Sequence, residues 1–187
     1  MSTKITREIA RTKRLVLRTF AETDRERLIA LAGDPVVMRH IGRPTGGTGE
    51  RTREDAEAMF ERLLQRGRTR PYAMWALTER HEDELIGWCG MQDLPGSDNV
   101  EIGWILDSRY WGRGYATEAA HAVLVYGFER VSLETIVAVA LPENVKSTNV
   151  MRRLGMRDCG LAQFYGRILA HFRLTAKEFE AARAELP

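Results

Sequence analysis

VEIGWILDSRYWGRGYATEA, residues 100–119, joins an apolar strand pattern to a helix through a turn with two glycines one residue apart. Residues 100–106 have the composition of a strand, and apolar residues recur at helical spacing over 116–128. A helix N-terminus offers unpaired amides, and glycines without a Cβ let an anion approach them closely. The stretch therefore predicts a phosphate-binding turn at Gly112 and Gly114.

Three kinds of phosphate loop compete for this turn, and their spacing separates them. A Walker loop needs GxxxxGK followed by Ser or Thr, which occurs nowhere in the chain. A dinucleotide fingerprint needs a third glycine where Thr117 stands, and an acidic residue at the end of the next strand, whereas Glu134 precedes it. The pyrophosphate loop of acyl-CoA transferases, [Q/R]xxGx[G/A], is matched by Arg109, Gly112 and Gly114. A turn that only permits close helix packing remains the alternative.

The remaining pattern predicts an α/β (α+β) fold with a mixed, mostly antiparallel sheet flanked by helices. Short turn-rich connections favour a meander of antiparallel strands, and strand, helix and strand in succession from 100 to 141 indicate a parallel crossover. One domain is expected over residues 1–187, with a glycine-rich loop at 44–49. The expected strands are 14–20, 72–78, 85–91, 100–106 and 135–141 with a hairpin over 159–174, and the expected helices are 24–32, 53–64, 116–128, 145–154 and 176–186.

Composition excludes several classes of function. The formal net charge is only +2 with both signs spread along the chain, so no direct nucleic-acid partner is expected. Cys89 and Cys159 lack a CxxC pattern and a neighbouring histidine, so neither a disulfide nor a metal site is predicted. Residues 1–14 lack an apolar signal region, and no apolar run approaches 18 residues. We therefore expect a cytoplasmic protein that makes no membrane contact.

With the turn at 109–114 and the later segment PENVKSTNVMRRLGM at 142–156, the chain resembles a GNAT-superfamily N-acetyltransferase of the ribosomal-protein alanine acetyltransferase (RimJ/RimL-type) branch. The resemblance covers nearly the whole chain and implies a GNAT fold whose sheet splays between its fourth and fifth strands, here 100–106 and 135–141. It further implies that acetyl-CoA places its pantetheine arm in that split.

The resemblance also implies which residues bind the cofactor. Trp104, Ile105 and Leu106 would offer backbone groups to the pantetheine and acetyl groups, and one of these amides would polarise the thioester carbonyl. Asn144 would either contact the cofactor or serve only as a helix N-cap. Arg109 and Arg113 would neutralise the pyrophosphate, and Lys146, Arg152 or Arg153 the 3′-phosphate. The amides of the turn would grip the diphosphate, and they belong to Trp111, Gly112, Arg113, Gly114, Tyr115, Ala116 and Thr117.

Two residues are candidates for catalysis. Ser147 matches a serine that the RimL-type enzymes are thought to use as partner of the leaving thiolate, whereas Met151 stands where many family members carry a tyrosine. Bonding of Ser147 back into its own helix is the alternative. Glu101 would act as a base through water, or be a structural strand residue. The glutamate expected in the last hairpin is missing, and Tyr165 and His171 are the polar residues there.

The predicted function is acetyl transfer from acetyl-CoA to a primary amine by direct attack of the amine. The acceptor is a protein N-terminus or a small molecule, and the sequence does not separate the two. A non-catalytic acyl-CoA-binding module is the alternative, because Met151 replaces the tyrosine and the hairpin glutamate is missing. A homodimer is left open.

Overall fold

The computed structural model describes residues 6–42 and 49–184, and its strands form one mixed sheet. Within this part of the chain, eight strands lie in the order β1-β2-β3-β4-β5-β6-β8-β7. Neighbouring strands are antiparallel except β5 and β6, which are parallel, so the predicted mixed sheet is confirmed. The strands are β1 (Glu8–Arg11), β2 (Leu15–Arg18), β3 (Met74–Glu79), β4 (Leu85–Asp93), β5 (Val100–Leu106), β6 (Thr135–Ala140), β7 (Arg157–Phe164) and β8 (Arg167–Thr175).

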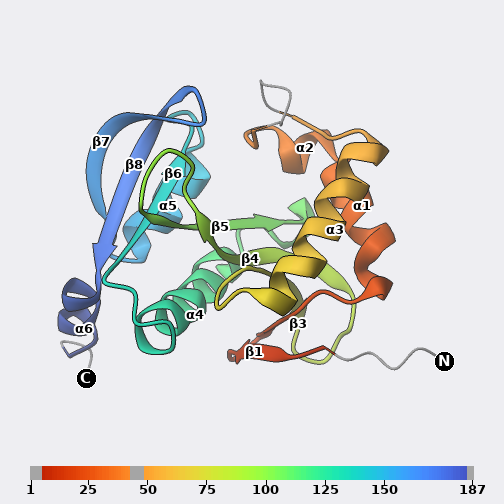
Figure 1. Ribbon diagram of the computed structural model, residues 1–187, viewed down its shortest axis with the longest axis horizontal. Coiled ribbons are helices and arrows are strands. Elements are labelled where there is room, and N and C mark those ends of the chain that lie inside the picture. The colour runs from red at the N-terminus through yellow and green to blue at the C-terminus, as the bar shows by residue number, and fades with distance from the viewer. Residues whose placement is uncertain (1–5, 43–48, 185–187) are drawn as a thin grey trace.

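Helices cover both faces of this sheet. On one face α1 (Arg25–Ala32) and α3 (Arg53–Thr69) pack against β4 and β3, and α2 (Pro35–Met38) follows α1 (Figure 1). On the other face α4 (Tyr115–Glu129) packs against β4 and β5. Its close approach requires Gly127, because a Cβ there would lie 2.7 Å from Ile136 Cδ1 and 2.9 Å from Met91 Sδ. The other helices are α5 (Val145–Arg153) and α6 (Ala176–Ala184), with 3-10 turns η1 (Glu22–Asp24) and η2 (Ser108–Tyr110).

β5 and β6 diverge after a short parallel contact. Their register contains only Val100 opposite Ile136 and Glu101 opposite Val137, and beyond these pairs the strands separate (Figure 1). Residues 102–106 therefore pair with β4 on one side and with no strand on the other. The splay expected between the strands 100–106 and 135–141 is confirmed.

Besides the two 3-10 turns, one strand and one α-helix were not predicted. β1 is a four-residue edge strand that begins with Glu8 and ends with Arg11, so its apolar signal is limited to Ile9 and Ala10. α2 follows the helix expected over 24–32; it begins at Pro35, and the Asp34 side chain accepts from the amides of Val36 and Val37. Apart from Gly49, the loop expected at 44–49 lies outside the described residues, as does the end of the last helix at 185–186.

The described helices give no sign of a membrane span, since none is both long enough and apolar enough to cross a bilayer.

Candidate active site

The glycine turn presents a row of free amides at the start of α4. Gly112 and Gly114 have φ of 76° and 78°, in the left-handed region that is unfavourable for residues with a Cβ. The first helical hydrogen bond runs from Glu118 N to Gly114 O at 3.0 Å. Within the described residues, the amides of 112–117 therefore have no acceptor. Such a run of amides at a helix N-terminus is a ready anion site.

The turn is held in place by side chains from near β2 and from β3. Arg14, which precedes β2, donates from Nη1 to Arg113 O at 2.9 Å and pairs with Glu118 at 2.5 Å. Tyr115 is buried, donates its hydroxyl to Glu79 at 2.5 Å and stacks its ring on that of Tyr110. These contacts fix the path of the main chain through both glycines.

The second feature of the site is the open edge of β5. Asp107 N donates to Ile86 O on the β4 side, and alternate residues of a strand direct their peptide groups to opposite edges. Trp104 and Leu106 therefore direct theirs towards the open edge, whereas Ile105 directs its own towards β4. Leu106 O already accepts from Trp111 Nε1 at 2.8 Å. The unclaimed groups are thus the Trp104 amide and carbonyl and the Leu106 amide.

A cleft of about 710 Å³ joins this edge to the turn and to α5. Eleven of the predicted site residues line it: Trp104, Ile105, Leu106, Trp111, Gly112, Gly114, Tyr115, Ala116, Thr117, Asn144 and Ser147. Arg109, Arg113 and Glu101 are not among its lining residues. Lys146 also lines the cleft, with its Nζ 4.1 Å from the centre of the Trp111 ring.

At the start of α5 the cap and the candidate proton donor are neighbours. Asn144 Oδ1 accepts from Ser147 N at 3.3 Å, so Asn144 is the N-cap. Ser147 is half-buried, and its hydroxyl makes no hydrogen bond to any described residue. Thr148 is the residue that bonds back into the helix, with Oγ1 3.2 Å from Val145 O. The Ser147 hydroxyl is therefore free to face the cleft.

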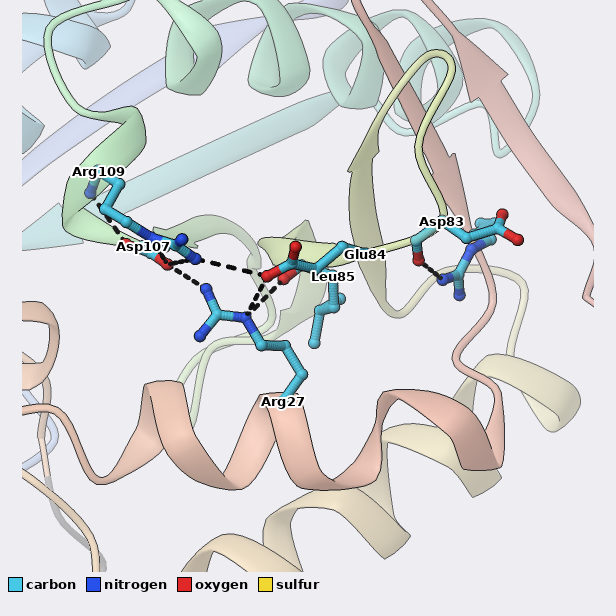
Figure 2. A network of polar contacts seen from close by, with 7 residues as sticks. Arg27, Asp83, Glu84, Leu85, Asp107 and Arg109 are labelled. Atoms are coloured by element: carbon cyan, nitrogen blue, oxygen red, sulfur yellow. Dashed lines mark hydrogen bonds and ion pairs between the residues drawn. The ribbon is translucent and has the colours of Figure 1, made fainter.

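The Arg109 side chain is bound by carboxylates and does not line the cleft. Its Nε and Nη2 lie 2.9 and 2.7 Å from Asp107 Oδ2, and its amide donates to Asp107 Oδ1 at 2.9 Å (Figure 2). Arg27 of α1 binds the same carboxylate, and Glu84 bridges the two arginines at 3.1 and 3.4 Å. Burial raises the pKa of Asp107, but the hydrogen bonds from Arg109 and Arg27 outweigh it and lower the pKa to about 2.

Glu101 lies where β5 and β6 still pair, and only 8% of it is exposed. Its Oε2 accepts from Gln92 Nε2 at 3.2 Å and from the Tyr165 hydroxyl. Burial raises its pKa, and these two hydrogen bonds oppose that rise. Because burial raises its pKa, this carboxyl binds a proton more readily than an exposed glutamate does.

His171, the other polar residue expected in the hairpin, contacts Phe164 with ring centres 5.2 Å apart. Its Nε2 is buried and has no hydrogen-bond partner among the described residues. Burial lowers its pKa, which favours the neutral form of the ring.

The α2 wall of the cleft was missed from the sequence. Val37, Arg39, His40 and Ile41 line the side opposite α5. The available signal was Asp34 before Pro35, because Asp is a common N-cap and Pro is common in the first helical turn. No group of three or more side chains among the described residues could hold a metal ion.

An open strand edge that leads to a turn of free amides defines a protein that takes up an extended, phosphate-bearing ligand, as acyl-CoA-dependent transferases do. The model of the acetyltransferase (GNAT) domain matches residues 14–157. The chain belongs to the GNAT acetyltransferase family, and it is an N-acetyltransferase that uses acetyl-CoA.

Known relatives agree with this assignment. The chain is 36% identical over 149 residues to the uncharacterized N-acetyltransferase YnaD of Bacillus subtilis, covering 80% of this chain and 82% of that protein. An acetyltransferase crystal structure from Agrobacterium tumefaciens is 28% identical, with a TM-score of 0.76 over 88% of this chain and 92% of that one. The aminoglycoside acetyltransferase AAC(6')-Ib, solved in complex with coenzyme A, shares the fold at 16% identity, with a TM-score of 0.74 over 90% and 99% of the two chains.

Proposed function

We propose that this chain transfers the acetyl group of acetyl-CoA to the α-amine of a peptide N-terminus, by direct attack and without a covalent enzyme intermediate. The observation that carries the proposal is the single cleft that brings together the open edge of β5, the free amides of 112–117 and the unbonded Ser147 hydroxyl. In this role the turn holds the diphosphate, and the Trp104 and Leu106 peptide groups align the thioester.

Ser147 and Glu101 divide the proton transfers between them. The amine nitrogen forms a bond to the thioester carbonyl carbon, and the carbon–sulfur bond breaks. Glu101 takes one proton from the incoming ammonium through water and later releases it to solvent. Ser147 donates its hydroxyl proton to the departing sulfur and regains a proton from the attacking nitrogen, so the products are an amide, coenzyme A and one proton.

The charge of the cleft supports a peptide N-terminus over a polycation. Lys146 and Arg153 on the α5 side are candidates for the coenzyme A phosphates, whereas Arg39 lines the α2 side. Glu143 is the single carboxylate among the lining residues. A polyamine or an aminoglycoside would bring several positive charges into a cleft that offers one carboxylate and, at Arg39, a further cation, and like charges at an interface disfavour binding. The likeness of residues 142–156 to the ribosomal-protein alanine acetyltransferases points the same way.

The test is release of free coenzyme A from acetyl-CoA in the presence of amines. We would compare peptides that begin with alanine or serine, spermidine, and an aminoglycoside. Ser147→Ala should lower kcat by about tenfold or more and leave acetyl-CoA affinity unchanged. Ser97→Ala removes a hydroxyl from the β4–β5 connection, where it bonds Leu94 O, and should behave as the parent.

Three results would contradict the proposal in whole or in part. Failure of the parent to bind acetyl-CoA at millimolar concentration would remove its basis. Turnover by Ser147→Ala at the parent's rate would remove Ser147 from the mechanism. Faster acetylation of spermidine than of every peptide would show that the acceptor is a polyamine; the acetyl-transfer reaction itself would still stand.

A further inference from the structure

The turn between β7 and β8 contains a tyrosine in an unfavourable conformation. Tyr165 and Gly166 form the two-residue connection, with φ of 52° and 68°. Two-residue hairpin turns with positive φ at both positions favour Asn, Asp and Gly, because a larger side chain crowds its own backbone. Tyr165 is one of only two non-glycine residues with positive φ in the described part of the chain, so its presence calls for a compensating contact.

That contact is a closed set of hydrogen bonds with Glu101 and Gln92. The Tyr165 hydroxyl donates to Glu101 Oε2 and accepts from Gln92 Nε2 at 3.1 Å. Gln92 Nε2 also lies 3.2 Å from Glu101 Oε2. Gln92 and Glu101 are direct partners in the β4–β5 register, whereas Tyr165 comes from a hairpin 64 residues later.

Both donors reach the same oxygen of Glu101. Oε2 accepts from Tyr165 and from Gln92, and Oε1 has no hydrogen bond to any described residue. The carboxylate is thereby fixed about its own axis, with one oxygen held and one oxygen available. An available oxygen of fixed direction is what a base needs to reach a water or an ammonium.

Among the described residues, no charged side chain contacts Glu101 from the elements around it. On β6 its partner is Val137, and Val137 is in turn paired with Arg173 of β8. The Arg173 backbone is therefore two strand spacings, about 10 Å, from that of Glu101. His171 lies two residues further along β8, opposite Val139. On β4, Asp93 is bonded instead by the Tyr72 hydroxyl at 2.5 Å. Hydrogen bonds, and not ion pairs, oppose the effect of burial on this carboxyl.

We propose that Tyr165 is a positioning residue for acetyl transfer, which keeps the Glu101 carboxylate charged and correctly oriented through a hydrogen bond from the β7–β8 turn. The role rests on the proposed function, because it acts through Glu101 as the base. The β7–β8 hairpin thus supplies a phenol hydroxyl that sets the charge and the orientation of the Glu101 carboxylate. A tyrosine that only fastened the hairpin to the sheet would change stability and leave the titration of Glu101 where it is.

The test uses two substitutions at Tyr165 that separate the hydroxyl from the backbone conformation. Tyr165→Phe removes the hydroxyl and keeps the ring in the same turn. Tyr165→Asn also removes the hydroxyl but places a residue that tolerates positive φ. Tyr72→Phe is the matched control, since it removes another tyrosine–carboxylate hydrogen bond, that to Asp93.

The first readout needs no substrate. The side-chain amide signals of Gln92, followed by ¹⁵N NMR between pH 4 and pH 9, report the protonation of Glu101, and Glu101→Gln should abolish their titration. Because the Tyr165 hydrogen bond stabilises the charged carboxylate, both Tyr165 variants should move the midpoint to higher pH. Tyr72→Phe should leave it unchanged.

The second readout is the pH profile of kcat/KM with acetyl-CoA and an alanine-terminated peptide. Both Tyr165 variants should shift the acid limb upward and lose about tenfold to a hundredfold at neutral pH, the worth of one hydrogen bond to a charged group. Their affinity for acetyl-CoA, measured by calorimetry, should equal that of the parent, and Tyr165→Asn should unfold at a higher temperature than Tyr165→Phe.

An unchanged midpoint in Tyr165→Phe, or a parent-like pH profile in Tyr165→Asn, overturns the proposal. A parent that turns over no amine overturns the proposed function and the catalytic role together, and the NMR midpoints identify that case because they do not depend on turnover.

Discussion

Replacing Asp107 by asparagine should destabilise the fold in a manner that depends on pH. The Asp107 side chain is only 7% exposed and accepts hydrogen bonds from Arg27 of α1 and from Arg109 ahead of the glycine turn (Figure 2). Its pKa falls from the ordinary value of 3.8 to about 2. At 1.36 kcal/mol for each tenfold change, this difference corresponds to about 2.5 kcal/mol of stability at pH 7.

The sign follows from the direction of the shift. A carboxyl whose pKa is lower in the folded state stabilises the fold while it is ionised in both states, and this contribution is lost as the pH falls. It should be nearly complete above about pH 5 and disappear between about pH 4 and pH 2. In the Asp107→Asn variant it is absent at every pH.

The assay is urea unfolding of the parent and the Asp107→Asn variant at pH 7 and at pH 2.5. The variant should lose about 2.5 kcal/mol at pH 7, which lowers the melting temperature by about 5–10 °C for a chain of this length, and the difference should shrink to under 1 kcal/mol at the lower pH. Because both proteins share every other titrating group, the comparison isolates Asp107.

Glu84→Gln is the matched control. Glu84 contacts the same two arginines, but its side chain is 55% exposed, so its loss should cost less than 1 kcal/mol. An equal cost for both variants at pH 7, or an Asp107→Asn deficit that persists at pH 2.5, would refute the argument that the buried carboxylate organises this network.

Three further outcomes concern the cleft. Gly114→Ala should cost about 1 kcal/mol and weaken acetyl-CoA binding in calorimetry, because φ of 78° at the N-cap of α4 is unfavourable for a residue with a Cβ. Lys146→Gln should lower the affinity for acetyl-CoA and reduce its salt dependence, since its ammonium lies 4.1 Å from the Trp111 ring at the cleft wall; an unchanged salt dependence would remove Lys146 from the phosphate contacts. Asn144→Ala should lower the melting temperature by the loss of about 1 kcal/mol, because the amide of Ser147 loses its cap; thermal unfolding without a shift would contradict that assignment.

The strands and the splay were predictable because their signals are local. Alternation and short turns locate β3, β4 and β5, and the match at Arg109, Gly112 and Gly114 locates the turn. The contacts that a motif residue makes in the folded chain were harder to predict from the sequence. Arg109 has the expected place in the motif, but the carboxylate two positions before it binds its guanidinium.

Contacts between distant segments lay beyond the sequence. Glu101 and Tyr165 are 64 residues apart, and their meeting depends on the place of the β7–β8 hairpin in the sheet, next to β6. Arg14 reaches Arg113 O across 99 residues because the fold brings the segment before β2 next to the start of α4. Neither pair carries a periodic or motif signal, and each follows from strand order and register that only the folded chain defines.

The unpaired edge of β5 has a consequence for how this protein can evolve. The peptide group has the same donor and acceptor whichever side chain the residue carries, so most substitutions at Trp104 and Leu106 should leave a ligand bound through the main chain unaffected. The sequence of this strand edge can therefore diverge widely, while residues elsewhere in the cleft change the specificity for the acceptor. Proline is the exception at these positions, because it deletes the very amide that makes the surface useful.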